Sequence, residues 1–260
     1  MPYTDELQRI QTALAEAQAL VTERFTPGEV DARKKSGGDP VTEADTQIDT
    51  LLKRLLPRGE EGWLSEETLD DKTRLDSRRV WVVDPLDGTK EFVMGLPEWS
   101  ISVGLVEDGE AVAGGICNPA TGETILGARG HGVTLNGQPV SLSQRPRLEG
   151  AEVLASRSEV TKGQWKGWDG APYTIRAMGS VAYKLGRVAA GLSDATWTLV
   201  PKHEWDVAAG VALVLAAGGK IVAGTPEQER FNRPHPKLTS LIAAPPQLMP
   251  EILEEIARRG

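Results

Sequence analysis

One short segment of the chain concentrates residues that could bind a metal ion. Asp84 and Asp87 belong to segment 84–89, Asp-Pro-Leu-Asp-Gly-Thr, which follows the apolar residues 80–83. A turn at this point can direct both carboxylates and the Leu86 carbonyl toward one position. Such a set of oxygen ligands suits a hard cation that keeps several waters, Mg²⁺ before Zn²⁺. Without a cation, the segment is a β-turn with two solvated aspartates, because Asp, Pro and Gly all favour turns.

The end of the same segment is suited to phosphate. Gly88 lets the backbone turn into a short helix that we expect to begin near Thr89. The first amides of a helix have no partner within it and the helix dipole favours negative charge there, so a phosphate can bind at this end.

Other acidic residues could complete such a site. Glu66 and Glu67 follow an apolar residue, Asp206 stands at the start of a helix of small residues, and Asp45 lies beside the apolar face of another helix. Each also has a structural explanation. Asp206 could be a helix N-cap, and a carboxylate such as Asp45 beside core positions normally has a partner.

Apolar periodicity predicts the elements that must position these residues. Helices are expected at 4–25, 42–56, 180–190, 206–217 and 247–258. Strands are expected at 80–83, 99–106, 110–116, 125–128, 152–155, 173–176, 194–199, 220–222 and 240–243. The first half combines helices with a largely antiparallel sheet, and the second alternates strands with helices. The fold class is therefore α+β (mixed α/β), in two lobes of residues 1–148 and 149–260.

Composition limits the class of protein. The 260 residues carry a formal net charge of −8, which argues against nucleic acid as a partner. No apolar run approaches the roughly 18 residues of a membrane span, and no signal peptide is visible. The single cysteine, Cys117, excludes an internal disulfide and a thiolate metal cluster. We expect a cytoplasmic protein, either a monomer or a homodimer.

Taken together, the motifs resemble those of the inositol monophosphatase superfamily of metal-dependent, lithium-sensitive phosphatases. The resemblance runs along essentially the whole chain, through segments 40–45, 65–67, 84–89 and 205–210 and the trailing glycines at 217–219. It implies a layered αβαβα sandwich. Segment 90–92, Lys-Glu-Phe, is more similar to the CysQ-type 3′(2′),5′-bisphosphate nucleotidases than to inositol phosphatases. The inositol phosphatases usually have Thr-Asn-Phe at this point of the motif.

The resemblance also implies roles for individual residues. The metal ligands would be Glu66, Asp84, the Leu86 carbonyl, Asp87 and Asp206, holding two or three Mg²⁺ ions. Asp84 would bridge two of the ions. Thr89 would hydrogen-bond the attacking water and Asp45 would orient Thr89, which makes Asp45, Glu66 and Thr89 the catalytic set. Two metal ions in this arrangement activate the water and stabilise the leaving alkoxide.

Substrate contacts are assigned to Gly88, Thr89, Ser180 and Lys184, with Lys184 a candidate for binding a second phosphate. The inositol branch has a glutamate near the position of Leu199 or Thr198, and neither residue here can replace a carboxylate. No role is assigned to Lys34, Glu67, His203, Trp165 or Trp168.

The leading hypothesis is therefore hydrolysis of a small phosphate monoester, adenosine 3′,5′-bisphosphate to AMP and phosphate. The alternative keeps the chemistry and changes the substrate to inositol 1-phosphate or another sugar phosphate, such as fructose 1,6-bisphosphate. A non-catalytic phosphate-binding homologue is the remote alternative. It predicts loss of a water-activating residue, whereas Asp45, Glu66 and Thr89 are all present.

Overall fold

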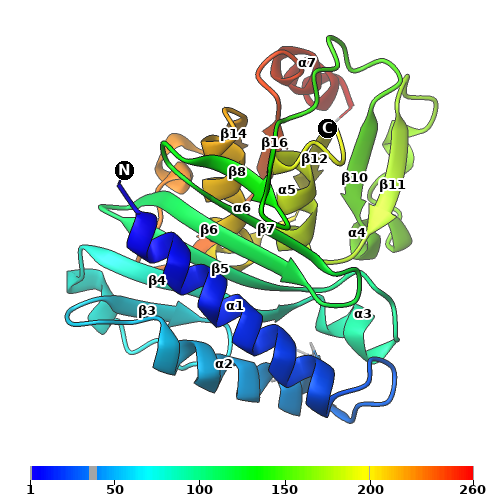
Figure 1. The fold of residues 1–260 in the computed structure, drawn as a ribbon. Coiled ribbons are helices and arrows are strands. Elements are labelled where there is room, and N and C mark those ends of the chain that lie inside the picture. The colour runs from blue at the N-terminus through cyan, green and yellow to red at the C-terminus, as the bar shows by residue number, and fades with distance from the viewer. Residues whose placement is uncertain (1, 35–39, 199, 260) are drawn as a thin grey trace.

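The structure, a computed structural model, describes residues 2–34, 40–198 and 200–259. Figure 1 shows two β-sheets with helices between and outside them. The described helices are α1 (Thr4–Arg24), α2 (Glu43–Leu55), α3 (Thr89–Val93), α4 (Arg157–Thr161), α5 (Val181–Ala189), α6 (Glu204–Ala216) and α7 (Met249–Arg259). Short 3₁₀ turns occur at η1 (Thr73–Asp76), η2 (Lys166–Trp168) and η3 (Pro226–Glu229).

The first sheet has the strand order β3-β4-β5-β6-β7-β8-β9. Its strands are β3 (Gly62–Ser65), β4 (Arg79–Asp87), β5 (Ser100–Glu107), β6 (Glu110–Asn118), β7 (Glu123–Ala128), β8 (Gly132–Leu135) and β9 (Gln138–Val140). All neighbours are antiparallel except β3 and β4, which are parallel. The largely antiparallel sheet expected in the first half is thus confirmed.

The second sheet has the order β11-β10-β12-β16-β14 and mixes parallel with antiparallel pairs. Its strands are β10 (Glu152–Ser156), β11 (Thr174–Met178), β12 (Ala195–Thr198), β14 (Lys220–Ala223) and β16 (Leu241–Ala244). Two small antiparallel pairs complete the described strands: β1 (Ala32–Lys34) with β2 (Pro40–Thr42), and β13 (Lys202–His203) with β15 (Lys237–Leu238).

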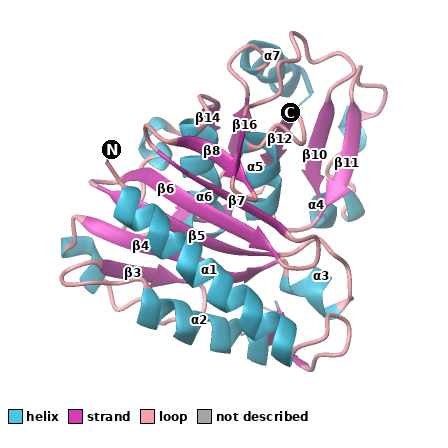
Figure 2. Cartoon of the chain, viewed as in Figure 1, coloured by secondary structure: helices cyan, strands magenta, loops and turns pink. Residues whose placement is uncertain are grey.

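Alternation along the strands shows how the layers are built, because successive side chains of a strand point to opposite faces. In β4, Trp81 and Val83 pack against α1 and α2, whereas Val80 and Val82 face the core shared with α5 and α6. In β10, Leu154 faces that same core, and its neighbours Val153 and Ala155 pack toward α7. The order is helices, sheet, helices, sheet, helix, as Figure 2 shows. The αβαβα sandwich is confirmed.

Helix α6 approaches the first sheet unusually closely. A Cβ added to Gly114 on β6 would lie 2.4 Å from the Ala209 carbonyl oxygen, and one on Gly104 of β5 would lie 2.8 Å from the Ala209 amide. Only glycines allow the helix backbone to rest on these strands at that distance. The close contact fixes the N-terminal turn of α6, and with it Asp206, over the sheet that carries Asp84.

Candidate active site

A cavity of about 400 Å³ is lined by residues from both halves of the chain. All of the residues expected to bind metal and all four expected substrate contacts line it: Glu66, Asp84, Leu86, Asp87, Gly88, Thr89, Ser180, Lys184 and Asp206. The segments that the motifs selected in the sequence therefore meet at one place.

Three carboxylates form the centre of the site. One oxygen from each of Glu66, Asp84 and Asp206 lies within 4.8 Å of the others, and the Asp84 side chain is buried. Glu66 follows β3, Asp84 lies in β4 and Asp206 lies in the first turn of α6. Strands β3 and β4 run parallel, with Ser65 opposite Val83. The residues that follow, Glu66 and Asp84, therefore lie side by side.

An irregularity in β4 shapes the turn that is expected to bind metal. The pairing of β4 with β5 shifts between Asp84, which is opposite Ser102, and Asp87, which is opposite Ser100. Within the shifted segment the Leu86 amide donates to Asp84 Oδ1 at 3.1 Å. This local bend directs side chains away from the regular alternation of a strand, as a β-bulge does.

Thr89 is held between two acceptors. Its Oγ1 lies 3.0 Å from Asp45 Oδ1 and 3.0 Å from the Leu86 carbonyl oxygen, so the hydroxyl proton can be donated to either. The other Asp45 oxygen accepts from the Thr42 amide and hydroxyl at 2.8 and 2.6 Å, which fixes the carboxylate at the start of α2. Gly88 has a φ of 96° and precedes the short helix α3, which begins at Thr89 as expected.

Burial and mutual repulsion dominate the electrostatics of the cluster. Burial raises the pKa of Asp84 well above its usual value, and the Glu66, Asp87 and Asp206 carboxylates raise it further. Burial, followed by the charges of Asp87 and Glu66, likewise raises the pKa of Asp206 to about 8. So many carboxylates in one buried place repel one another unless a cation is bound between them.

Asp87 lies outside the group of three close carboxylates and is held by the second half of the chain. Its Oδ2 accepts from the Ser180 hydroxyl at 2.7 Å and from the Ala182 amide at 2.6 Å, at the N-terminus of α5. Ser180 has a φ of 55°, and its oxygen also caps α5 by accepting from the Tyr183 amide. Ser180, expected to contact substrate, thus positions Asp87.

Lys184 is a buried cation at the cavity wall. The residue is only 2% exposed, and its Nζ donates to the Met178 carbonyl at 3.3 Å. Burial lowers the pKa of Lys184 to about 8, against the opposite effect of the nearby Asp87 carboxylate. An ordinary solvated helix lysine would be exposed, so this side chain has a specific place in the site.

Sequence reasoning missed two further residues of the cavity wall. Lys202 Nζ lies 3.9 Å from Glu159 Oε1, and both residues line the cavity. Glu159 is 1% exposed and accepts hydrogen bonds from Trp165 Nε1, at 3.0 Å, and from the Thr198 hydroxyl. Neither residue belongs to a motif. Lys202 and Glu159 are distant in the sequence and become neighbours only in the folded chain, so no local pattern marks them. Leu199, the other position considered for a substrate carboxylate, lies outside the described residues.

Asp49 was also missed, although a signal existed. It stands one helical turn after Asp45 on α2, and its two oxygens accept from the Ser65 hydroxyl at 2.5 Å and the Thr68 hydroxyl at 2.7 Å. These hydroxyls flank Glu66. Residues four apart lie on one helix face, so the acidic spacing could have indicated a second positioning carboxylate.

The residues without an assigned role lie in different surroundings. The Glu67 amide donates to the Ser65 hydroxyl at 3.3 Å, Lys34 is exposed on β1, and the His203 ring stacks on Trp205 with 4.3 Å between ring centres. Trp165 and Trp168 are buried together with Trp197, so they pack against β12 of the second sheet.

The fold and the site together define a class of protein. A partly buried group of carboxylates in a cavity that Leu86 also lines is a donor set for hard divalent cations, and the hydroxyl of Thr89 and the helix N-terminus suit a phosphate ester. This is the arrangement of a metal-dependent phosphohydrolase.

Comparison with known proteins gives the family. The inositol monophosphatase family profile matches residues 4–259. The chain is 34% identical to the fructose-1,6-bisphosphatase/inositol-1-monophosphatase of Thermotoga maritima, covering 75% of this chain and 76% of the relative. It is 30% identical to the inositol-1-monophosphatase of Caulobacter vibrioides, covering 95% and 98%. The chain therefore belongs to the inositol monophosphatase family, whose members are metal-dependent phosphomonoesterases.

Solved structures agree with this assignment. The Thermotoga maritima IMPase superimposes with a TM-score of 0.82 at 27% identity, covering 98% of both chains. CysQ from Bacteroides thetaiotaomicron, at 24% identity and a TM-score of 0.77 over 94% of this chain and 98% of that one, shares the fold. Among the residues the structure describes, no helix has both the length and the apolarity needed to cross a bilayer.

Proposed function

We propose that this chain is a Mg²⁺-dependent, lithium-sensitive 3′(2′),5′-bisphosphate nucleotidase of the cytoplasm. It would hydrolyse adenosine 3′,5′-bisphosphate to AMP and phosphate. Residues 1–148 supply most of the metal ligands in this proposal, and residues 149–260 supply Asp206 and the substrate side.

The donor set fits the metal. Glu66, Asp84, Asp87, Asp206 and the Leu86 carbonyl offer only oxygen atoms, which Mg²⁺ prefers, and the raised pKa values of Asp84 and Asp206 reflect negative charge in need of neutralisation. When bound, two or three Mg²⁺ ions would neutralise the phosphate dianion, lower the pKa of the attacking water and stabilise the leaving alkoxide.

The observation that carries the hydrolase proposal is the contact between Thr89 and Asp45 beside the carboxylate cluster. Asp45 accepts the Thr89 hydroxyl proton, which leaves the lone pairs of Thr89 Oγ1 available to accept a hydrogen bond from the attacking water. That hydrogen bond orients the water and favours loss of its proton. Most of the rate enhancement in phosphoryl transfer comes from positioning and charge stabilisation of this kind.

The choice of a bisphosphate substrate rests on the basic wall of the cavity. Lys184 and Lys202 both line the cavity and come from the second half of the chain. A buried ammonium group is stabilised by an anionic partner, and a second phosphate on the substrate would supply one. Inositol 1-phosphate has no second phosphate.

A second candidate function is hydrolysis of inositol 1-phosphate or fructose 1,6-bisphosphate, the activities in the name of the Thermotoga maritima relative. Glu159 favours it, because this buried carboxylate lines the cavity and a carboxylate can accept hydrogen bonds from sugar hydroxyls. A turnover panel of adenosine 3′,5′-bisphosphate, inositol 1-phosphate and fructose 1,6-bisphosphate, with and without Mg²⁺ and Li⁺, tests both. Mg²⁺-dependent turnover with the highest kcat/KM for the nucleotide is expected. Preference for either sugar phosphate would contradict the nucleotidase assignment.

A further inference from the structure

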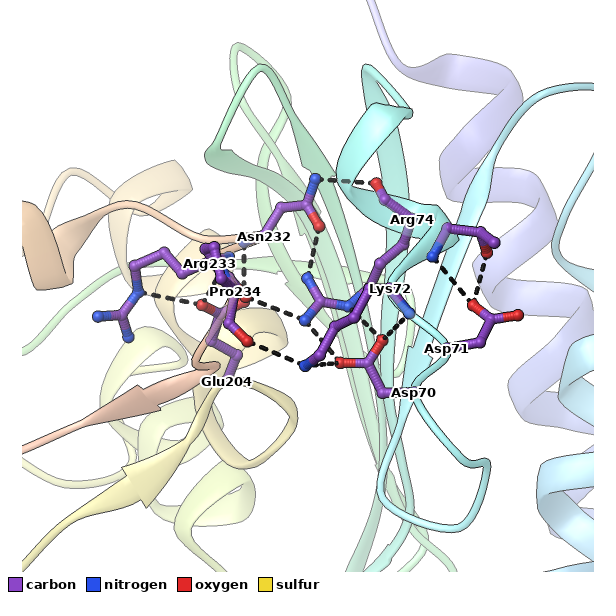
Figure 3. A network of polar contacts seen from close by, with 9 residues as sticks. Asp70, Asp71, Lys72, Arg74, Glu204, Asn232, Arg233 and Pro234 are labelled. Carbon is purple, nitrogen blue, oxygen red and sulfur yellow. Dashed lines mark hydrogen bonds and ion pairs between the residues drawn. The ribbon is translucent and has the colours of Figure 1, made fainter.

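A partly buried polar network lies outside the cavity and joins two segments that lead to the proposed metal ligands. It consists of Asp70, Arg74, Glu204, Asn232 and Arg233, which we call the Arg74–Glu204 cluster (Figure 3). Arg74 is 1% exposed and Glu204 is 0% exposed. Burying a charge is unfavourable unless partners compensate, so the two buried side chains need the partners that this network supplies.

The Arg74 guanidinium forms the half of the cluster on the Glu66 side. Its Nε and Nη2 donate to the two Asp70 oxygens at 3.0 and 2.8 Å, and Nη2 also donates to the Arg233 carbonyl at 2.9 Å. Arg74 packs against β3, because a Cβ added to Gly62 would lie 3.0 Å from Arg74 Cβ. Strand β3 ends at Ser65, one residue before Glu66.

The Glu204 carboxylate forms the half on the Asp206 side. It accepts from the Asn232 amide at 2.8 Å, from the Arg233 amide at 3.2 Å and from Arg233 Nε at 3.1 Å. Glu204 is the first residue of α6, two positions before Asp206. The loop at 232–233 is thereby attached to the same helical turn that carries Asp206.

Asn232 connects the two halves. Its Oδ1 accepts from Arg74 Nη1 at 2.7 Å and its Nδ2 donates to the Arg74 carbonyl at 3.1 Å, while its own amide binds Glu204. The φ of Asn232 is 58°, in the left-handed region that asparagine and glycine tolerate best. Arg74 and Glu204 are therefore linked through one side chain and its backbone.

We infer that the Arg74–Glu204 cluster sets the separation of Glu66 and Asp206, and that Arg74, Asn232 and Glu204 are positioning residues for the cation site. The inference rests on the proposed function, since it requires that Glu66 and Asp206 bind Mg²⁺. Mg²⁺ demands near-ideal octahedral geometry, so a small change in the separation of two ligands weakens its binding. The cluster lies outside the cavity and acts only through the segments that it joins.

The variant Asn232→Gly tests this inference. Glycine retains the positive φ and the amide that binds Glu204, but it removes both side-chain bonds to Arg74. The matched control is Asn136→Gly, because Asn136 also has a positive φ, 48°, and lies in the turn between β8 and β9. The measurements are the Kd for Mg²⁺ by calorimetry on the metal-free protein, the thermal midpoint, and kcat at saturating Mg²⁺.

For Asn232→Gly we expect the Kd for Mg²⁺ to rise about tenfold or more, with kcat recovering to within about twofold of wild type at saturating Mg²⁺. Asn136→Gly should bind Mg²⁺ as the wild type does. A folded Asn232→Gly protein with a lower thermal midpoint and an unchanged Kd would show that the cluster is only structural. If Asn232→Gly does not fold, Glu204→Gln, which keeps an acceptor oxygen but removes the charge, must show the same loss of Mg²⁺ affinity.

The same calorimetry separates this inference from the proposed function. A wild-type protein that binds no Mg²⁺ would overturn both. Wild-type binding with Mg²⁺-dependent turnover, together with unchanged affinity in folded Asn232→Gly and Glu204→Gln, would overturn the inference alone.

Discussion

Thr89 Oγ1 lies 3.0 Å from Asp45 Oδ1, although the two residues are 44 positions apart in the chain. Asp45 belongs to the first turn of α2 and Thr89 begins α3, so two helix N-termini meet at this hydrogen bond. Because the second Asp45 oxygen is held by Thr42, the carboxylate cannot easily rotate away from Thr89. In the proposed function, this fixed geometry would let Thr89 Oγ1 accept a hydrogen bond from the attacking water.

Thr89→Ala should lower kcat more than it changes KM. The variant removes the hydroxyl but keeps the backbone amides that can bind phosphate, so substrate binding survives while water activation is lost. We expect kcat to fall about 10²–10³-fold, in the range typical of acid–base catalysis, with KM within about threefold of wild type. Thr89→Ser, which retains the hydroxyl, is the control and should keep most of the activity. A raised KM with unchanged kcat would make Thr89 a substrate contact.

The partnership with Asp45 can be measured by a double-mutant cycle. If Asp45 acts through Thr89, Asp45→Ala and Thr89→Ala should each cost activity, but the double variant should cost little more than either alone. Fully additive losses in kcat would show that the two residues act independently.

Asp84→Asn should abolish metal-dependent turnover in a protein that still folds. Asparagine keeps the Oδ1 acceptor for the Leu86 amide, and the raised pKa of Asp84 means that the wild-type side chain tends toward the neutral form when no cation is bound. We expect activity to fall at least about 10²–10³-fold, because electrostatic positioning supplies most of the rate. Calorimetric Mg²⁺ binding and the thermal midpoint check this expectation. Asp108→Asn, in the exposed turn between β5 and β6, is the control, and near-normal turnover with bound Mg²⁺ in Asp84→Asn would exclude Asp84 as a bridging ligand.

Local signals predicted the elements around Asp84, whereas the layered sandwich and the meeting of Asp84, Glu66 and Asp206 were implied by the family resemblance, because those residues come from distant segments. The apolar residues 80–83 are all fully buried in β4, and the Gly88 turn leads into a helix at Thr89. These features follow from side-chain period and backbone preference. The strand and the turn are each encoded within a few residues.

The remainder of the site depends on tertiary contacts that have no local signal. Lys202 and Glu159 are 43 positions apart and become neighbours only when β13 and α4 meet at the cavity. Trp165 and Trp168 stand among polar residues, yet both are buried against Trp197 from β12. The burial of Lys184 is likewise set by the packing of α5 between the sheets, which a helical periodicity cannot reveal.

The pH dependence of Mg²⁺ binding follows from Asp206. Its pKa is raised from 3.8 to about 8 by burial and then by the charges of Asp87 and Glu66. The folded protein thus binds this proton more tightly than the unfolded chain, so the contribution stabilises the metal-free protein at low pH and is lost as the pH rises toward 8. Because Mg²⁺ displaces the proton, its affinity should rise about tenfold per pH unit below pH 8 for each proton released. Calorimetry from pH 6 to 9 measures this, and an affinity independent of pH between 6 and 8 would contradict it. In the metal-free state, Asp206→Asn should be more stable than wild type, by a margin that grows as the pH rises toward 8.

Lys184→Met should change substrate preference rather than chemistry. Methionine fills the buried volume but removes the charge, so the packing of α5 is retained while the partner for a second phosphate is lost. A charge-assisted hydrogen bond contributes about 1.5–3 kcal/mol, so kcat/KM for adenosine 3′,5′-bisphosphate should fall about 10–100-fold relative to kcat/KM for inositol 1-phosphate. The ratio is the decisive quantity, because Lys184 also acts on Asp87. Burial raises the pKa of Asp87 and the Lys184 charge opposes that rise, an effect common to both substrates. Lys220→Met, on the exposed start of β14, should leave the ratio unchanged. An equal loss on both substrates would place Lys184 at the metal-binding carboxylates alone and would remove the basis for a second phosphate site.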